Sequence, residues 1–342
     1  MFFRTVLLPK LKELEQLRKQ RRRLIMGLVM GICLLALAGP GVIAACAYGV
    51  ISYKNIIVPL LSLSSIPAFL VLLAVFSEAN AGQGWTMRKN GFSILERAFF
   101  GADQRRKRFS QEIIAPIVNY CLPGLRRLPG EYVGQADFFD SKFFGYNVGP
   151  YAGHNRFTGR LNLTADLDFS WLEADSVLSD KKGKKTYSRL FAGWFFVVHF
   201  PKSFRCSVII QPDLAEAALG WLGRSIQELA TPSHLTLLHL EDLEFEHYFR
   251  VHAEDQLEAR YLLSPVFMRL ATLFRKRLGA GLFLSFFRNC MYAALPGQIN
   301  DCFDLMTTRS LTDPSFARHL YQAVKGVTEL AESIEKNYIM WE

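Results

Sequence analysis

The sequence predicts an α+β protein with an N-terminal transmembrane helical hairpin followed by a cytoplasmic mixed α/β-sheet domain. Three observations support this fold class. The chain carries no charged residue from position 24 to 53 or from 55 to 77. Basic residues flank both runs, and the remainder mixes strand-like and helix-like patterns. A helix of about 20 apolar residues crosses a bilayer core, so each run is long enough to span a membrane.

We divide the chain into four segments by the position of these runs. They are a basic amphipathic helix (1–23), two transmembrane helices (24–77), a membrane-proximal helical region (78–125) and a cytoplasmic α+β domain that ends in a helix (126–342).

The distribution of lysine and arginine predicts the orientation of the hairpin. Eight basic residues precede the first run, only Lys54 lies between the runs, and seven follow between positions 88 and 108. Because basic flanks stay on the cytoplasmic side, both termini are expected in the cytoplasm. Each basic residue close to anionic lipid contributes about 1 kcal/mol. The candidate contacts with lipid headgroups are Arg21, Arg22, Arg23, Arg105, Arg106, Lys107 and Arg108.

The net charge of +9 does not indicate a nucleic-acid partner. Residues 1–108 hold 16 Lys and Arg against 5 Asp and Glu, whereas residues 109–342 hold 24 against 26. The positive charge therefore belongs to the part that flanks the membrane, and the predicted partners are membrane lipids and other proteins.

A cleaved signal peptide is the alternative interpretation of the first run. Ala36-Leu37-Ala38 has the small residues of a cleavage site. The leader is long and contains Glu13 and Glu15, and the apolar character continues to Ile51, which favours a membrane span.

The six cysteines show no spacing typical of metal ligands or of a disulfide framework. We expect separate buried thiols in a reducing compartment.

Several segments of the C-terminal region have strand-like patterns. Residues 161–169 alternate strictly between apolar and polar side chains, which predicts a half-buried strand. The segments 190–200 and 205–210 predict a strand, a turn and a second strand, with the first central in a sheet. A hairpin is expected across Arg288-Asn289, with positive φ at Asn289.

Helix signals appear at four places. One helix is expected to cover Ser93 to about Cys121 before Pro123-Gly124, and another covers 255–263. Ser264 and Pro265 are suited to cap and open a third helix, and a fourth begins after Asp313-Pro314 with a long apolar stripe.

Two carboxylates are the candidate reactive groups of the sequence. Asp166 and Asp168 share one face of the predicted strand, as paired carboxylates in an active site would. Asn162 and Thr164 lie on that face too, which favours solvent exposure. The histidine pairs are five residues apart, a poor spacing for shared metal ligation, and nucleotide-binding and hydrolase motifs are missing from the sequence. We therefore expect no metal and no cofactor, and assign no catalytic residue.

Three longer stretches resemble a known family. They are Gly193 to Phe204 (GWFFVVHFPKSF), Leu240 to Val251 (LEDLEFEHYFRV) and Asp255 to Pro265 (DQLEARYLLSP). In combination they resemble a bacterial membrane-protein family, the domain of unknown function 3137. His199 stands where this resemblance leads us to expect an Asp. The motif residues carried over are Phe196, Phe200, Phe245, Phe249, Asp255, Glu258, Arg260 and Tyr261.

The resemblance implies a bacterial inner-membrane protein with two spans and a cytoplasmic α+β domain, and implies no activity. We expect a membrane-anchored, non-enzymatic subunit or scaffold of a larger envelope or secretion assembly. The alternative is a membrane-bound enzyme or a lipid-headgroup-binding module.

Overall fold

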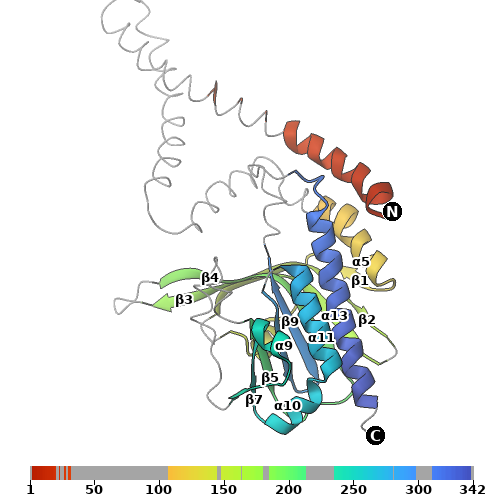
Figure 1. The fold of residues 1–342 in the computed structure, drawn as a ribbon. Coiled ribbons are helices and arrows are strands. Elements are labelled where there is room, and N and C mark those ends of the chain that lie inside the picture. The colour runs from red at the N-terminus through yellow and green to blue at the C-terminus, as the bar shows by residue number, and fades with distance from the viewer. Residues whose placement is uncertain are drawn as a thin grey trace, which may run out of the picture. The chain divides into compact units, whose positions relative to one another are not determined.

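The computed structural model describes most of the C-terminal region and part of the N-terminus (Figure 1). The described residues are 2–20, 107–144, 148–162, 164–179, 185–212, 235–279, 281–297 and 310–339, with single positions between 23 and 31. The chain divides into two compact units, each described by itself. The sheet unit comprises residues 1–3, 107–301 and 313–342, and the N-terminal unit comprises 4–106 and 302–312.

Residues 8–20 form a helix after a π-helical stretch at Phe3–Leu7. Within the N-terminal unit, Glu15 accepts hydrogen bonds from Arg18 at 2.9 Å and from the backbone N–H of Leu311 at 3.1 Å. The predicted spans fall outside the described residues, apart from single positions. Among the described helices, none has both the length and the apolar character needed to cross a membrane.

The sheet unit is built on one antiparallel sheet in the order β1-β2-β3-β4-β9-β8-β5-β7-β6. Its strands are β1 (Arg126–Leu128), β2 (Val148–Arg160), β3 (Asp166–Ser179), β4 (Lys185–His199), β5 (Val208–Pro212), β6 (Thr236–Leu238), β7 (Phe249–Ala253), β8 (Phe283–Phe287) and β9 (Cys290–Pro296). All described pairings are antiparallel, so the α+β class is confirmed and the sheet is not mixed in strand direction.

The helices of the sheet unit lie on both faces of the sheet. They are η2 (Ser110–Ile114), α5 (Ala115–Cys121), α6 (Gln135–Asp140), α9 (Leu243–Tyr248), α10 (Gln256–Leu262), α11 (Pro265–Leu278) and α13 (Ser315–Ile339). Figure 1 shows α11 and α13 side by side, and the contacts of α13 with α5 and β9 extend this layer.

Large aromatic side chains fill the core on both faces of the sheet. On one face, Phe157 stacks on Phe169, which stacks on Phe196, and the α11 residue Phe267 meets Phe286 at 5.7 Å. On the other face, Phe138 from α6 packs 5.5 Å from Phe195 of β4. The α6 segment and the α11–α13 pair therefore cover opposite faces, since residues 195 and 196 alternate along one strand.

Local signals place the helix ends where the sequence predicts them. Ser264 accepts a hydrogen bond from the N–H of Phe267, and Gly279 has φ of 62° after α11. Asp313 accepts from the N–H of Ser315 at 2.9 Å. The helix that ends at Cys121 is also confirmed over its described part.

Three strand predictions need correction. The predicted strand 161–169 begins only at Asp166, because the Asn162 side chain accepts the N–H groups of Thr164 and Ala165 and closes a turn. β4 is central as predicted, but β5 is not its neighbour, since β9 and β8 lie between them. The β8–β9 hairpin is confirmed, with positive φ at Arg288 (55°) instead of Asn289.

Candidate functional site

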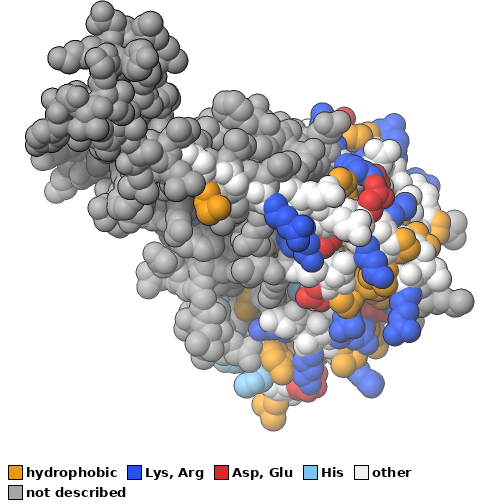
Figure 2. Space-filling view, turned by 90° about the horizontal axis from the view of Figure 1, so that it is seen from above, with side chains coloured by type: hydrophobic (Ala, Val, Ile, Leu, Met, Phe, Trp, Pro, Cys, Tyr) orange, Lys and Arg blue, Asp and Glu red, His pale blue; other side chains and the backbone are white. Residues whose placement is uncertain are grey.

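The basic residues predicted to flank the membrane are described only in part. Arg23 and Lys107 are exposed, and the Nε of Arg108 lies 2.6 Å from Glu112. Arg21, Arg22, Arg105 and Arg106 lie outside the described residues. In the view of Figure 2, Lys and Arg side chains are spread among hydrophobic and acidic ones over the described surface.

The aromatic motif residues belong to the core. Phe196 and Phe245 have no exposed surface, Phe249 is 2% exposed and Phe200 is 7% exposed. Phe245 and Phe249 pack against each other at 4.9 Å, and Phe200 meets the ring of Phe204 at 5.4 Å. These four rings therefore stabilise the fold and present no surface to a ligand.

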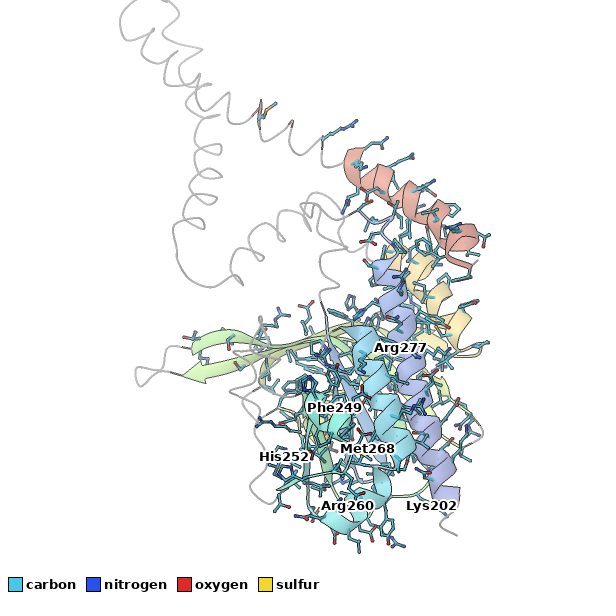
Figure 3. The ribbon with its side chains drawn as sticks, in the orientation of Figure 1. Lys202, Phe249, His252, Arg260, Met268 and Arg277 are labelled. Atoms are coloured by element: carbon cyan, nitrogen blue, oxygen red, sulfur yellow. The ribbon has the colours of Figure 1, made fainter. Side chains whose placement is uncertain are left out.

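The polar motif residues hold α10 in place. Asp255 accepts the N–H groups of Leu257 and Glu258 as the N-cap of this helix. Arg260 donates to the carbonyl of His239 at 2.7 Å, and Glu258 lies 3.4 Å from the guanidinium of Arg205. Figure 3 shows Arg260 on α10 and Lys202 at the same end of the sheet unit. The helix predicted over 255–263 is confirmed, and Asp255 stabilises its N-terminal end.

Apolar side chains point into solvent on and beside the same helix. Leu257 is 62% exposed and Tyr261 is 55% exposed, four residues apart and thus on one helix face. Val266, in the first turn of α11, is 61% exposed. We call Leu257, Arg260, Tyr261 and Val266 the α10 surface. Tyr and Arg are the residue types enriched where binding energy concentrates in protein interfaces, so a held arginine beside exposed apolar side chains suits protein binding.

The two carboxylates on β3 are engaged by arginines. Asp168, which is 8% exposed, receives hydrogen bonds from Nε and Nη2 of Arg156, the shortest at 2.6 Å. Asp166 lies 3.4 Å from Arg160. Each carboxylate therefore has a positive partner of its own, and the two do not form the closely interacting acid–base pair that catalysis by paired carboxylates requires. The arrangement is cross-strand ion pairing.

Sequence reasoning missed a cysteine–histidine pair on the face of the sheet covered by α6. His199 and Cys290 are direct cross-strand partners in β4 and β9. The Sγ of Cys290 lies 3.1 Å from Nδ1 of His199 and 3.7 Å from Oδ1 of Asn289. The pair is 91 positions apart in the sequence, so no local motif reveals it, and only the β4–β9 register brings the two together.

The surroundings of this pair keep the thiol neutral. Cys290 is 6% exposed, and burial raises its pKa. A hydrogen bond with Tyr292 and the charge of Arg288 lower this pKa, the negative charges of Asp137 and Asp140 raise it, and burial is the largest effect. Burial also raises the pKa of Asp137, although the charge of His199 partly opposes this. A nucleophilic cysteine needs a lowered pKa, so this pair fits a packed hydrogen-bonded core better than nucleophilic catalysis.

Metal ligation finds no support in the part of the chain that the structure describes. Within it, no group of three or more His, Cys, Asp and Glu side chains is arranged to hold a metal ion. Cys121, Cys206 and Cys290 are free thiols.

The fold and the α10 surface define an antiparallel α+β domain with an exposed apolar and basic helix face. Residues 189–336 match the model of the family described as "Protein of unknown function (DUF3137)", which confirms the predicted resemblance. The match covers most of β4 and all of β5, the α10 surface and the hairpin with Cys290.

The other comparisons add little. No curated protein matches the sequence. Among solved structures, the crystal structure of the mycobacterial trehalose monomycolate transport factor A, TtfA, is similar with a TM-score of 0.32 and 12% identity. The similarity covers 68% of this chain and 97% of that one. So low a score supports no inference about function.

Proposed function

We propose that this protein is a membrane-anchored, non-enzymatic subunit of a larger bacterial envelope or secretion assembly. In this proposal the apolar segments within 24–77 anchor it in the inner membrane with both termini in the cytoplasm. The sheet unit then presents the α10 surface to a partner protein. The observation that carries the proposal is the exposure of Leu257 and Tyr261 on α10 and of Val266 in the first turn of α11.

Covering these exposed side chains contributes free energy to the binding of a partner. Fully burying a side chain the size of Leu contributes about 2 kcal/mol, so a partner that covers Leu257, Tyr261 and Val266 gains several such contributions. The Asp255 cap and the Arg260–His239 hydrogen bond hold α10 before binding, which limits the conformational entropy lost on association. Single exposed apolar residues are common on protein surfaces and do not indicate a binding site. Leu257, Tyr261 and Val266, however, lie within one short stretch of the chain.

The alternative, a membrane-bound enzyme, is less well supported. Asp166 and Asp168 are ion-paired, and burial keeps Cys290 protonated. We therefore place the function of the sheet unit on its surface.

The test is photo-crosslinking of the full chain in intact cells. A photoreactive amino acid is placed in turn at Leu257, Tyr261 and Val266, with Tyr187 of β4, which is 48% exposed, as the matched control position. We expect a discrete crosslinked protein from the three α10-surface positions and none from position 187. Equal labelling from all four positions, or labelling by lipid alone, would contradict the proposal.

A pair of substitutions then tests the energetic contribution. L257S with Y261S removes the apolar side chains from exposed positions, so the unfolding midpoint is expected to change little. Co-purification of the crosslinked partner should fall at least about tenfold, which corresponds to about 1.4 kcal/mol. Retained co-purification would exclude this surface.

A further inference from the structure

A small polar cluster lies beside the helix that precedes β1. Its members are Ser110 in η2, Arg127 in β1 and Asn155 in β2. Nη2 of Arg127 donates to Oγ of Ser110 at 2.6 Å, and this hydroxyl hydrogen-bonds to Oδ1 of Asn155. Ser110 is 2% exposed and Asn155 is 4% exposed, while Arg127 is half-buried and reaches the surface.

Two buried donors of this cluster have no acceptor among the described residues. They are Nε of Arg127 and Nδ2 of Asn155. A buried donor without a partner costs about 1–3 kcal/mol, and more when the group is charged. Both nitrogen atoms belong to side chains that hydrogen-bond to the Ser110 hydroxyl, so both donors lie near this residue.

The charge of Arg127 is not balanced within the cluster. Burial lowers the pKa of Arg127, and none of the described carboxylates contributes to that change. Arginine elsewhere in this sheet behaves differently, since Arg156 binds Asp168 and Glu131, and Arg189 binds Glu173 and Asp175. A partly buried positive charge without an anion is unfavourable, and a guanidinium is well shaped to bind a tetrahedral oxyanion.

Two irregularities of the backbone build this cluster. Ser110 opens a π-helical stretch, a rare conformation that is frequent at functional sites. Asn155 has φ of 59° and sits in a register shift between His154 and Phe157. A β-bulge of this kind re-aims a side chain, and Asn is among the few residues that tolerate positive φ.

We propose that Arg127, Ser110 and Asn155 form a binding site for a phosphate-type oxyanion. The anion accepts from Nε of Arg127 and Nδ2 of Asn155, and the partial exposure of the Arg127 residue gives access from the surface. The choice of phosphate rests on the proposed membrane anchor, because residues 107–121 continue the region that follows the predicted spans. The phosphate can come from solution or from a lipid headgroup.

The test uses three variants of the full chain in an uncharged detergent. R127Q removes the charge, and N155D is isosteric, tolerates the same φ and places a carboxylate where the anion would bind. R126Q is the matched control, since Arg126 precedes Arg127 in β1 and is exposed. Thermal unfolding is followed by tryptophan fluorescence in inorganic phosphate and in sodium chloride of equal ionic strength.

We expect phosphate to raise the unfolding midpoint of the wild type and of R126Q by roughly 5 °C at a hundredfold excess over Kd. R127Q and N155D should show no such rise. N155D should have a higher midpoint than the wild type without phosphate, because its carboxylate balances Arg127. This second signature keeps the proposal testable if R127Q fails to fold.

A second arm distinguishes the source of the phosphate. Protein in phosphatidylcholine vesicles is compared with protein in vesicles that also contain phosphatidate. Protection by phosphatidate alone identifies a lipid headgroup, and protection by inorganic phosphate identifies a soluble anion. If neither protects, or if R126Q loses the effect as fully as R127Q, the site is wrong. Crosslinking at the α10 surface does not depend on this result, so the two proposals fail separately.

Discussion

At the scale of single residues, the titration of Cys121 gives a direct prediction. This residue ends α5 and is only partly buried, and burial raises its pKa to about 11 although the charge of Lys325 opposes the rise. The thiolate reacts with alkylating reagents, so its fraction at pH 8 falls on the order of a hundredfold below that of an unfolded chain. Iodoacetamide labelling, measured by peptide mass spectrometry, should be slower by about that factor in the folded protein.

The pH dependence of that labelling separates a raised pKa from steric protection. Below the pKa, the thiolate fraction rises tenfold for each pH unit. The rate for Cys121 should therefore keep rising from pH 8 to pH 10, whereas labelling in guanidinium chloride should level off near the ordinary cysteine pKa. A folded-state rate that is slow but levels off equally early would show that access, not the pKa, limits the reaction.

Single residues also show what local sequence can and cannot reveal. Asp255, Ser264 and Asp313 were predictable as caps, because a cap needs only its own neighbours along the chain. The His199–Cys290 pair and the Arg127 cluster were not predictable, because their members come from distant segments. In the β8–β9 turn, the preference of Asn for positive φ predicted the wrong residue, because Arg288 and not Asn289 has positive φ.

At the scale of elements, the packing of α11 against α13 depends on Gly326. A Cβ added there would overlap the ring of Phe274, which is 3% exposed. Alanine favours a helix by about 1 kcal/mol over glycine, so G326A would stabilise α13 if the added Cβ met no other atom. Forced overpacking costs about 1–3 kcal/mol, and we expect net destabilisation in urea unfolding.

The control for this prediction is G297A. A Cβ at Gly297 would lie 3.6 Å from the ring of Trp171, an ordinary van der Waals distance. Its effect should stay within about 0.5 kcal/mol. A G326A protein more stable than the wild type would mean that the two helices pack less closely than described.

Strand pairing marks the limit of prediction at this scale. The apolar run of β4 indicated a central strand, and β4 lies between β3 and β9. The segments 190–200 and 205–210 were predicted as a strand, a turn and a second strand, and the β8–β9 hairpin lies between the two observed strands, β4 and β5. The pairing of a strand with a distant hairpin depends on how side chains pack across the strands. A local sequence pattern therefore does not predict which strands pair.

At the scale of the whole molecule, the proposed function depends on the predicted membrane topology. The basic flanks of the two apolar runs predict that the 52–55 link faces outward and that the C-terminal half faces the cytoplasm. Free thiols at Cys121, Cys206 and Cys290 suit a reducing compartment. The α10 surface can meet a cytoplasmic partner only if this orientation holds.

Alkaline phosphatase fusions in a bacterial host test the orientation, because this enzyme becomes active only outside the cytoplasm, where its disulfides form. A fusion after Lys54 should be active, and a fusion at the C-terminus should be inactive. The matched control replaces Arg21, Arg22 and Arg23 by Gln in the Lys54 fusion, which weakens the cytoplasmic bias of the first flank and should lower its activity. An active C-terminal fusion would place the sheet unit outside the cytoplasm. The α10 surface would then face an extracytoplasmic partner, and the predicted orientation would be wrong.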